Sequence, residues 1–148
     1  MAIVRSAGTE IIRSAHFEDV DDTVQILIFG EQHHIYTVLS VICYCAARSG
    51  TEEGYLSLLG YDAHAGTTAQ TIALADVSAS AGETFVWENK FSFNGHEPTD
   101  FSGQMDSIVK QDAIADQGSS VVQKLRFATA SSSTKYDITV TFIDQNNS

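Results

Sequence analysis

The sequence is poor in cysteine and in long apolar runs, and both shortages exclude classes of protein. The only two cysteines, Cys43 and Cys45, stand two apart in a strand-like run, where their side chains point the same way and are poorly placed to bridge. Nothing therefore indicates an oxidising compartment. No apolar run approaches the roughly 20 residues that span a bilayer. The start has no basic leader before an apolar stretch, so we expect folding in the cytoplasm.

Basic residues are also scarce. Eight of them stand against nineteen acidic residues, which gives a formal net charge of −11. The resulting field repels phosphate and anionic headgroups, so we expect neither a nucleic acid nor a membrane as a partner. A chain of 148 residues forms one domain and buries about two thirds of its extended surface. It therefore needs no metal, disulfide or cofactor in order to fold.

Strict alternation of apolar and polar residues marks the end of the chain. Tyr136, Ile138, Val140 and Phe142 fall on one face of a strand, with polar residues between them. A similar strand with inward Leu125 and Phe127 precedes it, after which comes the polar run 131–134. This arrangement predicts an antiparallel hairpin.

Further strands are expected upstream at the roughly 8 to 12 residue spacing of a sandwich. We place them at 24–29, 33–45, 54–61, 70–77 and 83–88, and an acidic loop at 17–22. The run 33–45 is apolar on both faces, which predicts a central strand covered on both sides. The fold class is therefore all-β, an antiparallel, jelly-roll-like β-sandwich over residues 17–148.

The first sixteen residues contain a short repeat, IVRSA at 3–7 and again as IIRSA at 11–15. Its adjacent apolar pairs place apolar side chains on both faces of a strand, so residues 1–16 are predicted to form an arm or hairpin. It is either packed on its own domain or laid on a neighbouring subunit. In the second case its contact residues would be Ile3, Val4, Arg5, Ile11, Ile12 and Arg13.

One segment departs from the strand pattern. Met105, Ile108 and Val109 have helical spacing, so residues 104–116 are predicted to form a short helix that caps the sandwich. An extended conformation is the alternative.

Two groups of residues have the right atoms for a metal but lack a metal-site spacing. His33 and His34 with Cys43 and Cys45 do not show the short pairs of a zinc finger. The acidic residues of 17–22 lack the glycine and the later glutamate of an EF-hand loop. We expect no metal site, and calcium binding at this loop stays open.

Catalytic pairs are equally unsupported by motifs. Cys43 with a histidine, or Ser102 or Ser107 with His96, could supply a nucleophile and a base, but no nucleophile-elbow motif is present. We expect no enzyme activity, although two carboxylates for glycoside cleavage have no fixed spacing.

Aromatic residues offer a further possibility. Tyr55, Tyr61 and Trp87 could stack on a sugar if they are exposed. Trp87 shares a strand face with Phe85, however, and core burial is the ordinary state of both.

Two phrases of the sequence carry a resemblance to a known group. The segment AGETFVW at 81–87 and the closing DITVTFIDQ at 137–145, together with the strand, turn and strand of 34–59, resemble small β-sandwich virion structural proteins of tailed bacteriophages. Capsid decoration, or cement, proteins are the most similar in size, acidity and lack of an active site. The likeness is one of strand-and-turn pattern over about three quarters of the chain.

The resemblance implies a role in the virion. The protein would bind the major capsid protein on the capsid exterior, commonly as a homotrimer, and stabilise the shell by bridging subunits. The arm would then add a strand to a neighbouring sheet. A tail or head-to-tail connector protein and a carbohydrate-binding module are the alternatives.

Overall fold

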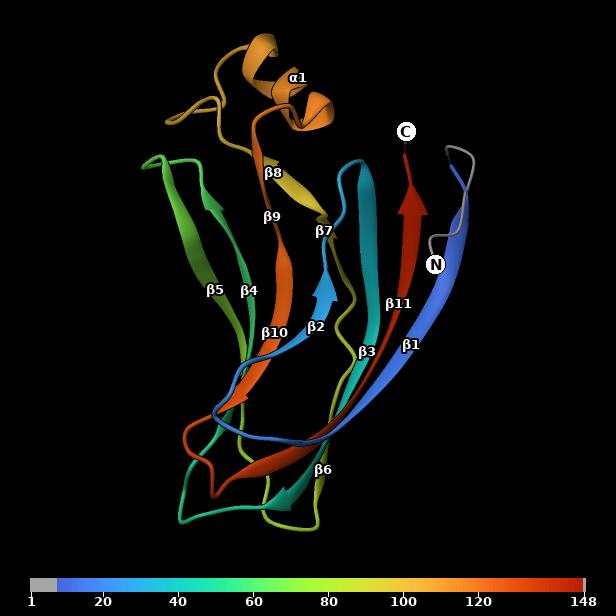
Figure 1. The fold of residues 1–148 in the computed structure, drawn as a ribbon, viewed down its shortest axis with the longest axis vertical. Helices are drawn as coiled ribbons and strands as arrows, with labels where there is room; N and C mark the ends of the chain where they lie inside the picture. Colours follow the sequence, from blue (N-terminus) through green and yellow to red (C-terminus); the bar gives the residue numbers. More distant parts are fainter. Residues whose placement is uncertain (1–7, 148) are drawn as a thin grey trace.

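The computed structural model describes residues 8–147 and shows an antiparallel β-sandwich with one short helix (Figure 1). The predicted fold class is confirmed. The elements, in chain order, are β1 (Glu10–Val20), β2 (Gln25–Phe29), β3 (His34–Ala47), β4 (Gly54–Asp62), β5 (Thr67–Val77), β6 (Thr84–Trp87), β7 (Phe91–Asn94), β8 (His96–Pro98), α1 (Ile108–Asp116), β9 (Ser120–Val122), β10 (Lys124–Thr129) and β11 (Lys135–Asn146).

The strand order identifies the sandwich as a jelly roll. One sheet, called sheet A here, runs β1-β11-β3-β6, with β7 also paired to β3. The other, sheet B, runs β2-β10-β4-β5, and β8 and β9 form a separate pair near the helix (Figure 1). The chain crosses between the sheets so that early and late strands become neighbours in each, as in two interleaved Greek keys.

The closing strand packs as its alternation predicts. Tyr136, Ile138 and Val140 on β11 are fully buried, and Phe142 is 7% exposed. Leu125 and Phe127 on β10 are fully buried as well. The ring centroids of Phe127 and Tyr136 lie 5.5 Å apart in an edge-on arrangement, which joins the inner faces of the two sheets.

The predicted hairpin of these two strands is wrong. β10 pairs with β2 and β4 in sheet B, whereas β11 pairs with β1 and β3 in sheet A. Each strand has only one apolar face, and the two faces meet across the sandwich instead of lying side by side in one sheet. The connection at 130–134 therefore crosses between layers.

Strand β3 is central in sheet A, as predicted, but it is not buried on both faces. A bulge at Leu39 lets Ser40 pair with Thr141 and Val38 pair with Phe142. The extra residue reverses the alternation, so residues on both sides of the bulge point inward, namely Tyr36, Val38, Val41, Cys43 and Cys45. Ile42 is 39% exposed as a result. The apparently two-faced pattern is one face read across a bulge.

Strand β1 extends further than expected at both ends of the predicted boundary. It pairs with β11 from Glu10 to Val20, so the boundary between an arm at 1–16 and a domain at 17–148 falls inside a strand. The acidic loop begins only after Val20. Glu18 and Asp19 lie instead at an irregularity between Phe17 and Val20, where Asp19 has a φ of 55° and its N–H donates to Asp137.

The predicted helix is confirmed over a shorter range. α1 follows Ser107, whose side chain accepts a hydrogen bond from the Lys110 N–H as an N-cap does. Its apolar residues do not cap the sandwich, because Met105, Ile108 and Val109 are 48%, 70% and 79% exposed. Within residues 8–147 no helix has the length and apolar character to cross a membrane.

Candidate functional site

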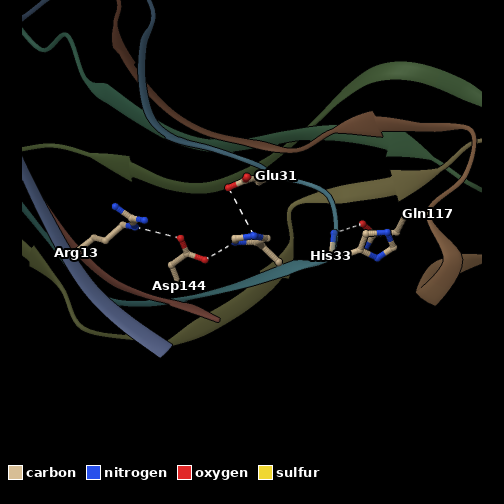
Figure 2. Close-up of polar contacts among 6 residues, drawn as sticks. Arg13, Glu31, His33, Gln117 and Asp144 are labelled. Atoms are coloured by element: carbon tan, nitrogen blue, oxygen red, sulfur yellow. Dashed lines mark hydrogen bonds and ion pairs between the residues drawn. The ribbon is translucent and has the colours of Figure 1, made fainter. Parts of the chain in front are cut away.

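A buried carboxylate joins three neighbouring strands of sheet A (Figure 2). Asp144 on β11 is 3% exposed. Its Oδ2 lies 3.1 Å from Nε of Arg13 on β1, and its Oδ1 lies 2.6 Å from Nδ1 of His34 on β3. The second ring nitrogen of His34 lies 3.6 Å from a carboxylate oxygen of Glu31. We call these four residues the Asp144 cluster.

The geometry of the Asp144 cluster suits fastening strands better than catalysis. Each ring nitrogen of His34 faces a carboxylate, so neither is directed at a hydroxyl or thiol nucleophile. The negative charges act on the neighbouring phenol, since burial, Asp144 and Glu31 all raise the pKa of Tyr36. The cluster therefore holds β1 against β11 and β3.

The start of β3 is also tied to the helix. The His33 N–H donates to Oε1 of Gln117 at 2.6 Å, and the side chain of Gln32 donates to the Gln117 carbonyl (Figure 2). Gln117 adopts a left-handed φ of 48° at the end of α1. The helix is thus fixed next to the end of sheet A that contains the Asp144 cluster.

A second polar feature is a cleft where β8 and β9 meet β4. Two adjoining cavities of about 250 and 370 Å³ share Tyr61, Ala63, Glu97 and Gln123. The Tyr61 N–H donates to Oε1 of Glu97 at 2.8 Å. Gly60 is required beside it, because a Cβ at that position would lie 2.0 Å from the same oxygen. We call this feature the Glu97 cleft.

Burial shapes the titration of both ionisable groups on β8. It raises the pKa of Glu97, and the hydrogen bond from the Tyr61 N–H offsets this in part. It lowers the pKa of His96, to which nearby His33 adds a smaller effect. His96 is therefore mainly a neutral imidazole at pH 7.

The predicted cysteine and histidine candidates do not come together as a site. Cys43 and Cys45 are free thiols buried in the core, and burial raises the pKa of Cys43 to about 12. A thiol with that pKa is not an active nucleophile near neutral pH. His34 belongs to the Asp144 cluster instead.

The acidic residues after Phe17 do not form a ligand cage either. Glu18 and Asp19 lie on β1, and the Asp21 side chain accepts from the Thr23 N–H. No group of three or more metal-ligating side chains gathers anywhere in the part of the chain that the structure describes.

The serine and histidine candidates are separated as well. His96 contacts Ser120, with 3.0 Å between Nδ1 and Oγ, and not Ser102 or Ser107. Ser107 serves as the N-cap of α1. The Ser120 hydroxyl donates in turn to the Gln117 carbonyl, so it is part of the structural connection below the helix.

The three candidate aromatics also lie apart. Trp87 packs against the core with Phe85, as predicted. Tyr55 is 42% exposed on β4, and Tyr61 lines the Glu97 cleft. They do not share one platform, since the alternation of β4 and the position of β6 in the other sheet direct them to different surfaces.

The predicted contact residues of the arm have different surroundings. Ile3, Val4 and Arg5 lie outside the described residues. On β1, Ile11 is half-buried, Ile12 is 72% exposed on the outer face, and Arg13 contacts Asp144. Their role in binding a capsid stays a prediction.

Sequence reasoning missed both polar features, although one of them left a signal. Asp144 continues the inward series of β11 two residues after Phe142, so a charged side chain at that position predicts a buried partner. Glu97 gives no comparable signal, because β8 is a three-residue strand beside the only proline.

Comparisons with known proteins give similarity of structure only. No protein-family model and no curated protein matches the sequence. A chain from pili that form Bacillus endospore appendages is 13% identical, with a TM-score of 0.41 over all of this chain and 97% of that one. A chain from infectious bursal disease virus, Gx strain, is 10% identical, with a TM-score of 0.48 over 99% of this chain and 35% of that one.

A second structure of the same virus gives a similar result. In its T13 particle, the matching chain is 8% identical with a TM-score of 0.42, and 99% of this chain covers 37% of that one. This protein thus spans about a third of the length of the viral chains it matches. The solved structures with this likeness are components of viral particles and of a bacterial pilus.

Proposed function

We propose that this chain is a virion structural protein that decorates the outside of a bacteriophage capsid and stabilises it without catalysis. The observation that carries the proposal is the jelly-roll strand order, an architecture that viral capsid domains share with lectins and cupins. Because a fold alone does not specify a function, the surface of sheet A and the sequence resemblance to phage virion proteins carry the rest.

The outer face of sheet A offers a contact surface with few charges. Cross-strand register places His16, Thr139, Ile42 and Val86 in one row. Ile42 and Val86 are 39% and 44% exposed, and Ile12 in a parallel row is 72% exposed. Exposed aliphatic side chains on a hydroxyl-rich, weakly charged face suit contact with another protein.

The position of β1 favours a strap. β1 is an edge strand of sheet A, with β11 on one side. From Gly8 onward the chain is hydrogen-bonded to the end of β11, since Gly8 donates to the Asn146 carbonyl and Thr9 accepts from the Asn146 N–H. The apolar pair Ile3 and Val4 directly precedes this fixed point, which suits binding to a capsid subunit by strand addition. A homotrimer over a junction of capsid subunits would place three such straps together.

Deleting residues 2–7 is expected to abolish capsid binding while leaving the fold intact. A deletion as far as residue 15 would remove half of β1 and the Arg13 contact to Asp144, so it must stop before Gly8. The measurement is co-sedimentation with heads that lack the protein, beside urea unfolding of the free protein. We expect at least a tenfold loss of bound protein and an unchanged unfolding midpoint.

Matched substitutions keep the length of the arm constant. Ile3→Ser with Val4→Ser should reproduce the loss, whereas Ala2→Ser with Ser6→Ala should bind as the unaltered chain does. Normal binding by the deletion variant would contradict the strap. Binding only at one vertex or along the tail would instead indicate a connector or tail component.

A further inference from the structure

The Glu97 cleft has the dimensions and the walls of a small-ligand site. Its two cavities, of about 250 and 370 Å³, meet at the side chains of Tyr61, Glu97 and Gln123. The smaller one lies below the helix segment, where β8 and β9 approach the end of sheet B (Figure 1). Ligand sites are typically concave, largely apolar and equipped with a few converging polar groups.

The polar groups of the cleft are fixed but incompletely used. The Tyr61 N–H holds one carboxylate oxygen of Glu97 in place. Gln123 is 7% exposed, and its backbone joins Gly95 and Gly30 through hydrogen bonds of 2.8 and 2.9 Å. Within residues 8–147 the side-chain amide of Gln123 makes no hydrogen bond, although it faces both cavities. An amide in that position is suited to a ligand that both donates and accepts.

The apolar walls come from a separate part of the chain. Phe101, Met105 and Ile114 line the smaller cavity opposite the polar groups. The Tyr61 hydroxyl donates to the Phe101 carbonyl at 3.0 Å, which fixes the phenol ring at the junction of the two cavities. One side of a bound molecule would thus contact apolar surface while the other meets hydrogen-bonding groups.

The charges around the cleft select against anions. Neither cavity is lined by a lysine or arginine, and Glu97 and Asp62 contribute acidic groups. An ammonium ligand would satisfy Glu97 but would give no acceptor to the N–H groups of Gln123. A pair of neighbouring hydroxyls serves both, because each can donate to the carboxylate and accept from the amide.

We propose that the Glu97 cleft binds a neutral monosaccharide unit, free or at the end of a glycan, with its hydroxyls bridging Glu97 and Gln123. Its carbon-bound hydrogens pack on the apolar wall of the cleft. This site is distinct from the outer face of sheet A and from the arm. A protein fixed to a capsid through those surfaces would leave the cleft available to a second partner.

Two-dimensional amide NMR with single neutral hexoses and N-acetylhexosamines tests the site directly. At least one sugar at about 10 mM, ten times a 1 mM dissociation constant, should shift the side-chain amide signals of Gln123 and the backbone signals of Tyr61 and Ala63. Glu97→Gln should weaken binding at least tenfold, while Glu88→Gln, at an exposed position, should leave it unchanged.

A second variant guards against a folding defect. Ala63→Leu fills the wall shared by the two cavities without removing a polar group, so it should abolish the shifts in a protein that unfolds normally. The proposal is overturned if no neutral sugar shifts these signals, if sugars shift only signals around Tyr55, or if a simple primary amine shifts the cleft signals where sugars do not. None of these outcomes bears on capsid binding, so the two proposals fail separately.

Discussion

Replacing Asp144 by alanine is expected to lower the free energy of unfolding by about 3 kcal/mol, the lower end of the cost of breaking a buried ion pair. The substitution removes the carboxylate that both Arg13 and His34 contact, at 3.1 and 2.6 Å. The lower end applies because the Arg13 side chain is 42% exposed and keeps part of its hydration. Urea unfolding followed by tryptophan fluorescence measures the loss.

Controls separate this effect from a general loss of negative charge. Asp76→Asn, at an exposed position on β5, should change the free energy of unfolding by less than about 0.5 kcal/mol. Asp144→Asn keeps the shape and one acceptor oxygen, so its cost should fall between the two. An Asp144→Ala protein within 1 kcal/mol of the unaltered chain would show that the cluster does not fasten β1.

Replacing Tyr136 by alanine is expected to cost about 3 to 5 kcal/mol, as large-to-small changes of buried aromatics do. Tyr136 is fully buried on β11 and packs edge-on against Phe127 of the opposite sheet. Its hydroxyl accepts from the Ala79 N–H and donates to the Val77 carbonyl, each at 3.2 Å. One side chain therefore joins sheet A to the end of β5.

Tyr136→Phe separates the hydroxyl from the ring. It should cost about 1 to 3 kcal/mol, because the Ala79 N–H and the Val77 carbonyl would lose their partner in a buried place. Tyr44→Ala provides the control, since Tyr44 is 40% exposed on the outer face of sheet A. Equal costs for the substitutions at 136 and 44 would contradict the packing described above.

The period-two pattern was sufficient to predict the strands and their inward faces, but not how the strands pair. Leu125, Phe127, Tyr136 and Ile138 all point inward as their alternation predicts. Alternation says which face is buried and nothing about which neighbour completes the sheet. The polar run at 131–134 suits both a hairpin and a crossing between sheets, and only the packing of the whole core decides between them.

The bulge in β3 and the two polar features depend on contacts between distant parts of the chain. Leu39 is displaced because β11 brings Thr141 opposite Ser40, one hundred residues further along the chain. Asp144 and His34 become partners through the same pairing. The Glu97 cleft requires β4, β8 and the residues before α1 to meet. No local pattern in a single sequence predicts such meetings.

The copy number and position of this chain in a purified particle test the central claim most directly. Quantitative mass spectrometry against the major capsid protein, with electron cryomicroscopy of the same particles, gives both values. A capsid decoration protein should occur in proportion to the shell subunits and lie on the outer surface over their junctions. A handful of copies at one vertex or along the tail would contradict decoration, and absence from the particle would contradict the whole account.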